Sequence, residues 1–148
     1  MNSSTFKNRE REAGMAIELV AKNSCQQFLN REWEKAIENG NKPDENNLVP
    51  MACSLGGNFN TGRAAVMGLS TGKVLDYTTK NKMCHSCDEA KKAGKQRKDH
   101  DCTKNHSGSS NSMEPLAAVE LLNKVTESNV KFSLYTGDDD SATESHLK

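Results

Sequence analysis

Residues 84–114 read CHSCDEAKKAGKQRKDHDCTKNHSGSSNSME and form a lysine-rich stretch in the second half of the chain. It holds three of the five cysteines and three of the four histidines. Cys84 and Cys87 are separated by two residues, a spacing that lets both sulfurs turn onto one metal ion. Cys102 follows as a third candidate ligand. The pattern predicts a zinc-binding element at residues 84–110, which we call the Cys/His loop.

A histidine is expected as the fourth zinc ligand. His100 precedes Cys102 by two residues and His106 follows it by four. Both spacings occur in zinc sites, and spacing alone does not choose between them.

Two other interpretations of these cysteines have to be weighed against zinc. A CxxC pair can be a redox centre, but such a pair more naturally opens a helix after a strand, whereas charged residues and Gly94 follow Cys87 here. A disulfide framework requires an oxidising compartment, and the polar N-terminus has no apolar segment typical of a signal peptide. We therefore favour zinc, and we expect Cys25 and Cys53 to be buried or inert thiols.

Composition bounds the class of protein. A chain of 148 residues fits one domain, and its 34% hydrophobic and 5% aromatic content indicates an incompletely cored domain or part of a longer one. The formal net charge is zero, so contact with nucleic acid would need a local basic patch. No apolar run approaches the ~20 residues of a membrane span. We expect an intracellular protein, nuclear if it binds DNA, with no membrane association and no small-molecule substrate; protein partners are unknown.

The first 41 residues predict an amphipathic helix after a disordered start at residues 1–8. Apolar residues recur at three- and four-residue steps through residues 10–38, among them Ile17, Val20, Phe28 and Trp33. Phe28 and Trp33 are expected to pack on the domain rather than bind a ligand. Gly40 then ends the helix as a left-handed cap.

Short apolar runs with turn residues between them predict an antiparallel three-strand meander. The runs cover residues 48–55, 63–69 and 73–79, and the glycine-rich residues 56–62 between the first two are typical of a turn. Pro50 would confine the first run to a sheet edge or weaken it.

A helix and a fourth strand are expected after the Cys/His loop. Ser109, Ser110 or Ser112 can cap the helix, whose apolar pattern ends near residue 128. Residues 130–135 alternate like a strand. The fold class is therefore α/β.

The last expected strand leads into the acidic segment GDDDS at residues 137–141. Carboxylates at the end of a strand are suited to Mg²⁺, which prefers oxygen ligands, and paired Mg²⁺ ions drive phosphoryl transfer. Asp138 and Asp140 would point to the same side if the strand continued. A run of aspartates by itself is usually a solvated turn.

Three segments together resemble the Mutator-like transposase domain of mobile elements. They are TGKVLDYTTKNKMCHSCD (71–88), HDCTKNHSGSSNSMEP (100–115) and YTGDDDSAT (135–143). The resemblance spans residues 48–143 and implies an RNase H-like fold, with residues 45–148 as its N-terminal part. It also implies His100 as the fourth zinc ligand, because the family carries an HxC pattern there.

The resemblance bears on catalysis as well. It implies that the second acid of the family is Asp138 or Asp140, while Ser54 stands where the first acid belongs and the third would lie beyond Lys148. We therefore expect a transposon-derived, catalytically inactive chain that uses zinc structurally and needs Mg²⁺ only if it is competent. An active nuclease completed by a partner chain is a second hypothesis.

DNA contact, if retained, is expected at the basic residues of the Cys/His loop. These are Lys91, Lys92, Lys95, Arg97 and Lys98. Such side chains can contact phosphates, although Asp88, Glu89, Asp99 and Asp101 lie among them. The alternative is a zinc-binding protein-interaction module without a nucleic-acid role.

Overall fold

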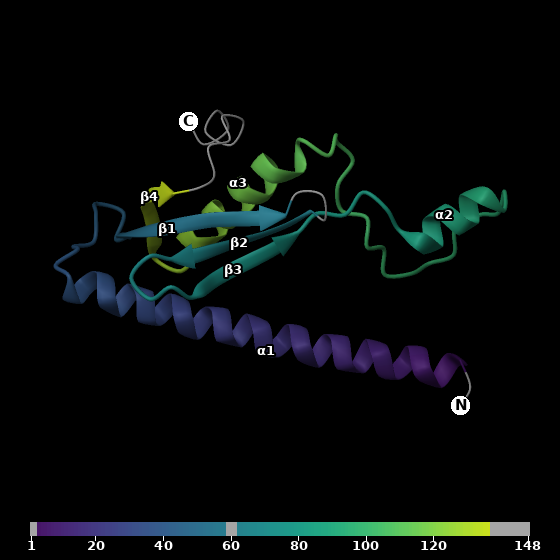
Figure 1. The fold of residues 1–148 in the computed structure, drawn as a ribbon, viewed down its shortest axis with the longest axis horizontal. Coiled ribbons are helices and arrows are strands. Elements are labelled where there is room, and N and C mark those ends of the chain that lie inside the picture. Colours follow the sequence, from purple (N-terminus) through teal and green to yellow (C-terminus); the bar gives the residue numbers. More distant parts are fainter. Residues whose placement is uncertain (1–2, 59–61, 137–148) are drawn as a thin grey trace.

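The computed structural model describes residues 3–58 and 62–136, and the structural statements below concern these residues. The elements follow in the order α1 (Ser3–Glu38), β1 (Val49–Asn58), β2 (Arg63–Gly68), β3 (Val74–Thr79), α2 (His85–Lys92), α3 (Met113–Thr126) and β4 (Val130–Thr136) (Figure 1). Among the described helices, none is long and apolar enough to cross a membrane.

The four strands form one mixed sheet in the order β3-β2-β1-β4. β1, β2 and β3 pair antiparallel as a meander, whereas β4 lies parallel to β1 on its other side. A parallel neighbour requires a crossover connection, and α3 is the helix that carries the chain from β3 across to β4. The predicted α/β class, with a meander, a helix and a fourth strand, is therefore confirmed.

One hydrophobic core joins the sheet to α1 and α3. Alternate residues of β1, Val49, Met51 and Cys53, are almost fully buried, as strand periodicity requires for a face that packs on helices. They share a cluster with Leu29 of α1 and Leu121 of α3. The prediction that Cys25 and Cys53 are buried is confirmed.

The first helix differs from the prediction in length and in orientation. It begins at Ser3, so the expected disordered start is wrong for residues 3–8. Its packing stripe consists of Cys25, Leu29, Glu32 and Ala36, all in the C-terminal half and all buried.

The predicted apolar positions Ile17 and Val20 are exposed instead, by 69% and 65%. They lie on other sides of the helix from the packing stripe, and the N-terminal half of α1 runs beyond the sheet (Figure 1). Phe28 packs against the core as expected, whereas Trp33 remains 38% exposed.

Strand β1 also departs from the prediction, because it is longer and central. Gly56, Gly57 and Asn58 continue the strand and pair with β2, so the predicted turn is wrong there. The expectation that Pro50 confines this strand to a sheet edge is wrong, because β1 lies between β2 and β4. Pro50 is accommodated because pairing with β2 begins only at Cys53. At Pro50 the strand has β4 as its single neighbour, and a missing N–H is tolerated on such a side.

Candidate metal centre

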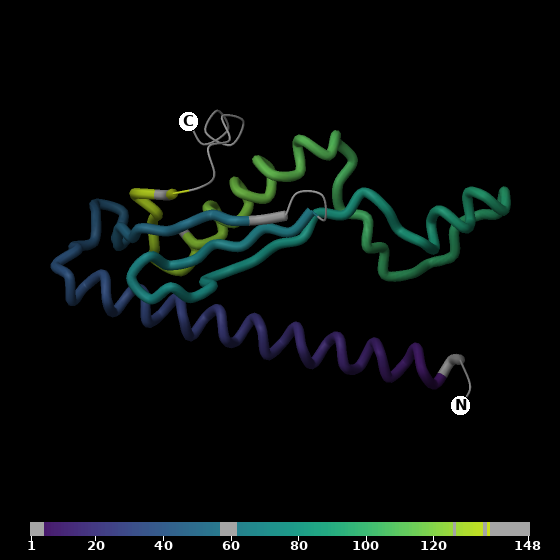
Figure 2. The backbone as a smooth tube through the Cα atoms, viewed as in Figure 1, coloured from purple at the N-terminus to yellow at the C-terminus, as the bar shows by residue number. Residues whose placement is uncertain are grey.

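The Cys/His loop leaves the sheet at the end of β3. Its returning segment runs alongside its outgoing segment and leads into α3. Figure 2 shows the outgoing and returning segments running together away from the sheet. Asn105 joins the two segments where the loop meets the sheet. Its side chain accepts a hydrogen bond from the Asn81 amide at 2.6 Å and donates one to the Thr79 carbonyl at 2.7 Å.

Cys84 and Cys87 lie at the start of a short helix that the sequence did not predict. Cys84 is the N-cap of α2, with extended backbone angles, and Cys87 lies in the first turn. This geometry turns both sulfurs toward the same side. The charged residues that argued against a helix lie on its exposed surface, and no residue of α2 itself is buried.

The returning segment brings His100 and Cys102 to face the two thiols. Gly94 ends the turn after α2 with φ 60°, a left-handed conformation suited to glycine. His100 and Cys102 are two residues apart, a spacing that places side chains on one side of an extended segment. The ligand atoms of all four residues lie within 4.8 Å of one another.

The individual distances match a tetrahedral ion. His100 Nε2 lies 3.2 Å from Cys84 Sγ and 3.5 Å from Cys87 Sγ, and the sulfurs of Cys87 and Cys102 are 3.6 Å apart. Zinc–ligand bonds of about 2.0–2.3 Å give tetrahedron edges of about 3.5–3.8 Å. A disulfide would need sulfurs about 2.05 Å apart, and all five cysteines are free. The cluster can therefore bind a metal such as zinc.

The imidazole of His100 is oriented by its second nitrogen. Nδ1 donates a hydrogen bond to the carbonyl oxygen of Lys98 at 2.9 Å, which leaves Nε2 to face the sulfurs. Metal-binding histidines are commonly held in this way.

The electrostatics of the cluster also favour a cation. The pKa of Cys84 falls to about 5, because the Cys87 amide donates to its sulfur and His100 lies beside it. The pKa of Cys87 rises, first through burial and then through the neighbouring sulfurs of Cys102 and Cys84. The negative charge of one thiolate thus disfavours ionisation of the next thiol. A divalent ion offsets this repulsion because it binds the thiolates directly.

His106, the other candidate ligand, lies outside the cluster. It is buried, and its Nε2 lies 3.1 Å from the Ser109 carbonyl and 3.1 Å from Ser112 Oγ. It therefore orders the turn that precedes α3. Ser112 is the N-cap of that helix, but its side chain makes no cap hydrogen bond and donates to the Ser109 carbonyl instead.

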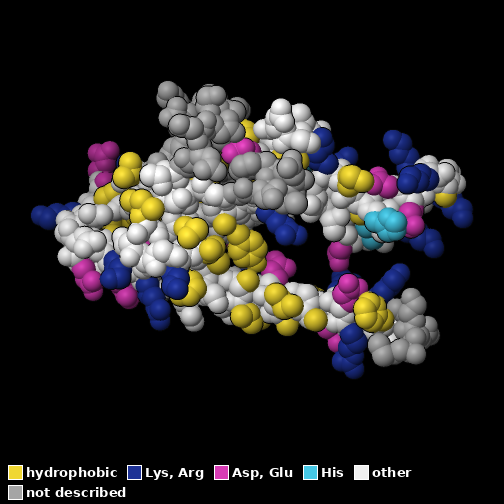
Figure 3. Space-filling view, viewed as in Figure 1, with side chains coloured by type: hydrophobic (Ala, Val, Ile, Leu, Met, Phe, Trp, Pro, Cys, Tyr) yellow, Lys and Arg dark blue, Asp and Glu magenta, His cyan; other side chains and the backbone are white. Residues whose placement is uncertain are grey.

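The basic residues of the Cys/His loop are exposed at the far end of the molecule. Figure 3 shows Lys and Arg side chains around this end, near the histidines. Arg97 was not expected to touch the metal ligands, yet its Nη1 lies 3.8 Å from Cys87 Sγ. Two nearby acids have partners: Asp101 pairs with Arg11 of α1, and Glu89 with His85. No sequence pattern indicated these pairings with Arg11 and Arg97.

The candidate catalytic acids Asp138 and Asp140 lie outside the described residues. The strands leading to them are described, and Ser54 of β1 is the register partner of Thr136, the last residue of β4. Ser54 therefore lies beside the C-terminal end of β4, its parallel neighbour in the sheet.

Comparison with known proteins identifies the family of the chain. The family model described as Mutator-like transposase matches residues 1–148. No curated protein and no solved structure matches the chain. The family match covers the whole chain, including the Cys/His loop and the mixed sheet, and the chain therefore belongs to the Mutator-like transposase family.

Proposed function

We propose that this chain is a transposon-derived part of a Mutator-like transposase in which structural zinc closes the Cys/His loop beside an RNase H-like sheet. The observation that carries the proposal is the convergence of Cys84, Cys87, His100 and Cys102 within 4.8 Å. Three thiolates and one imidazole fill the four positions of a structural zinc ion and leave none open for a substrate.

The loop needs such an ion because it has little core of its own. No residue of α2 is buried, so the apolar burial that normally stabilises a helix is absent from this part of the described chain. Metal binding at structural sites contributes folding energy directly. Zinc would thus hold the exposed basic residues in a defined arrangement.

We further infer that this loop contacts DNA phosphates. The exposed positions of Lys91, Lys92, Lys95 and Lys98, together with the ion pair of Asp101 with Arg11, support a locally positive surface. Phosphate contacts of this kind position a protein on DNA without reading sequence.

Catalysis by this chain alone is not part of the proposal. The resemblance aligns Ser54 with the first acid of the family, and a serine hydroxyl carries no negative charge for a divalent ion. We expect no Mg²⁺-dependent strand cleavage of plasmid DNA above the level of buffer. Cleavage that disappears in Asp138→Ala would contradict this expectation.

Metal content of the purified chain tests the zinc assignment. We expect about one zinc per chain, loss of zinc in Cys102→Ser, and full retention in the matched control Cys25→Ser, whose buried thiol lies outside the cluster. Circular dichroism before and after chelation reports whether structure is lost with the metal. Absence of zinc from the wild-type chain, or equal loss in both variants, would refute the assignment.

Salt-dependent binding to duplex DNA tests the role of the loop. Replacing Lys91, Lys92, Lys95 and Lys98 by alanine should weaken binding and reduce the slope of log K against log salt by about 0.9 for each lost phosphate contact. A control with Lys7, Lys35, Lys42 and Lys131 replaced changes the net charge equally elsewhere. Zinc binding without salt-dependent DNA binding would favour the alternative, a protein-interaction module, which the zero net charge of the chain also suits.

A further inference from the structure

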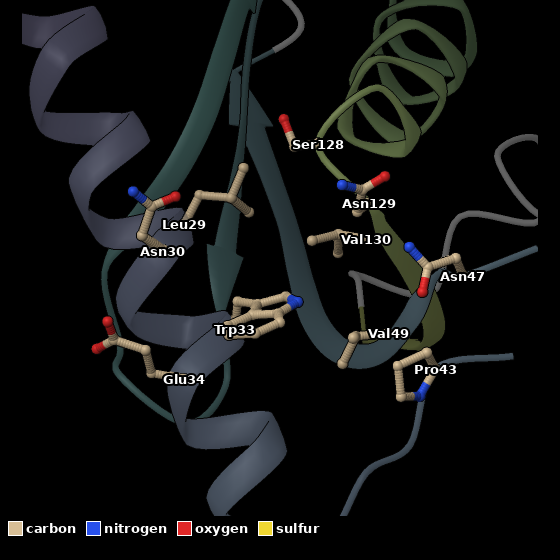
Figure 4. A pocket seen from close by; sticks show the side chains of 10 residues that line it. All are labelled: Leu29, Asn30, Trp33, Glu34, Pro43, Asn47, Val49, Ser128, Asn129 and Val130. Carbon is tan, nitrogen blue, oxygen red and sulfur yellow. The ribbon is translucent and has the colours of Figure 1, made fainter.

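A pocket of about 390 Å³ lies at the opposite end of the sheet from Ser54 and Thr136, where β1 and β4 begin. Its lining comes from α1, from the segment before β1 and from the α3–β4 connection (Figure 4). Pockets that bind small organic groups usually measure about 300–1,000 Å³. The size therefore suits one ring system and its immediate substituents.

One wall of the pocket is aromatic and the facing wall is amide. Figure 4 shows the indole of Trp33 on the helix side, facing across Val49 and Val130 toward the side chains of Asn47 and Asn129. Val49 and Val130 are almost fully buried and form an apolar floor. This combination offers a stacking surface together with hydrogen-bonding groups for the edge of a flat ligand.

The two asparagines are held in place by their backbones. Both adopt left-handed angles, with φ 61° for Asn47 and 59° for Asn129. The backbone N–H of Asn47 donates to the backbone carbonyl of Asp44 at 2.9 Å, and the backbone carbonyl of Asn129 accepts from the backbone N–H of Val49 at 3.0 Å. Among the interactions within the described chain, none satisfies the side-chain amide of Asn47 or Asn129 or the indole N–H of Trp33. The backbones of the two asparagines are therefore fixed, and their exposed side-chain amides are free to meet a ligand.

The charge of the lining excludes phosphate as the anchoring group. Glu34 is the one charged residue among those described around the pocket, and no lysine or arginine lines it. We propose that the pocket binds an unpaired nucleobase, stacked on Trp33 and hydrogen-bonded at its edge by Asn47 and Asn129. This inference rests on the proposed function, because it takes the base from a nucleic acid. It does not depend on zinc.

Tryptophan fluorescence tests the proposal directly, because Trp33 is the single tryptophan of the chain. Stacking of a base on the indole should quench its emission, so titration of the full chain with adenosine and with cytidine should give saturable quenching. Ribose 5-phosphate lacks a base and should leave the emission unchanged. Failure of both nucleosides to quench, or quenching that rises without saturation, would overturn the proposal.

A double variant separates specific binding from simple collision. Asn47→Gly with Asn129→Gly removes both amides, and glycine tolerates the left-handed angles, so the backbone is not strained. We expect about tenfold weaker binding of nucleosides, since two hydrogen bonds are lost, with unchanged circular dichroism. Equal affinity in the variant would overturn the assignment, as would saturable quenching by methyl glucoside, which would identify a sugar site.

The source of the base is distinguished by oligonucleotides. Tighter binding of a single strand than of adenosine, with no quenching by a fully paired duplex, supports an extrahelical base of a nucleic-acid strand. Quenching by nucleosides alone supports a free nucleoside. Because these titrations use the zinc-loaded chain and do not depend on the basic loop, their failure would leave the zinc and phosphate tests unaffected.

Discussion

Nε2 of His100 lies 3.2 Å from Sγ of Cys84, although the two residues are 16 positions apart in the chain. The contact joins the returning segment of the Cys/His loop to the N-cap of α2. His106 does not face the sulfurs, because its Nε2 contacts the Ser109 carbonyl and Ser112 Oγ instead.

Thiol reactivity should change stepwise with metal removal. In the zinc-bound chain we expect no rapid reaction with a thiol reagent, because Cys84, Cys87 and Cys102 are ligands and the other two cysteines are buried. Chelation should expose three thiols. Cys53 should still react slowly, since burial, followed by the nearby Glu32, raises its pKa to about 12. Five thiols reacting at once after chelation would mean that the domain unfolds with the loop.

Replacing Glu32 should destabilise the domain. The residue is 1% exposed. Its carboxylate accepts hydrogen bonds from the backbone amides of Ser70 at 2.8 Å and Thr71 at 2.9 Å. Hydrogen bonds to a charged group contribute about 1.5–3 kcal/mol, so Glu32→Ala should lower the free energy of unfolding in urea by roughly 3 kcal/mol. Glu38→Gln, on the exposed end of the same helix, is the control and should change little.

Two glycines with similar backbone angles should differ in their tolerance of alanine. Gly62 and Gly72 have φ 64° and 65°. A Cβ at Gly62 would lie 1.9 Å from the Lys80 carbonyl oxygen, whereas one at Gly72 would meet nothing within 4 Å. Gly72→Ala should therefore lose about 1 kcal/mol of stability through its backbone angle alone.

Gly62→Ala should lose at least about 2 kcal/mol more than Gly72→Ala in urea unfolding, because the backbone at Gly62 or at Lys80 must move. Equal losses would show that the contact between Gly62 and Lys80 relaxes freely.

Stability should depend on pH through Glu120 of α3. Burial raises the pKa of this carboxyl, but hydrogen bonds from Lys80 and Thr78 outweigh burial and leave the pKa below its usual value of 4.5. A group with a lowered pKa stabilises the fold above its unfolded pKa and loses that effect as the pH falls through the folded pKa.

Glu120→Gln should therefore lower stability by a fraction of a kcal/mol at pH 7, because the pair is partly exposed. The difference from wild type should disappear as the pH falls below 4.5. A difference that persists at pH 3 would show that packing, rather than charge, makes the contribution.

Local sequence patterns were sufficient for the order of the four strands and of helices α1 and α3. Alternation and turn residues placed β2, β3 and β4 within one residue of their ends, because each pattern acts over a few neighbouring residues. The same reasoning missed α2, because half of its eight residues are charged and no apolar period identifies it. It also ended β1 too early, since glycines that favour a turn are held in the strand by pairing with β2.

The sequence by itself determined the candidate ligands, their spacing and the family to which they point, because these depend on which residues are present. Spacing left His100 and His106 open, and the family resemblance favoured His100, which the tertiary structure places with the thiols. Only the tertiary structure decided that α1 packs through Cys25 and Leu29 rather than Ile17 and Val20, and that Trp33 meets two asparagines across a pocket. Each of these outcomes depends on side chains distant in the chain competing for the same space, and a local pattern carries no information about that competition.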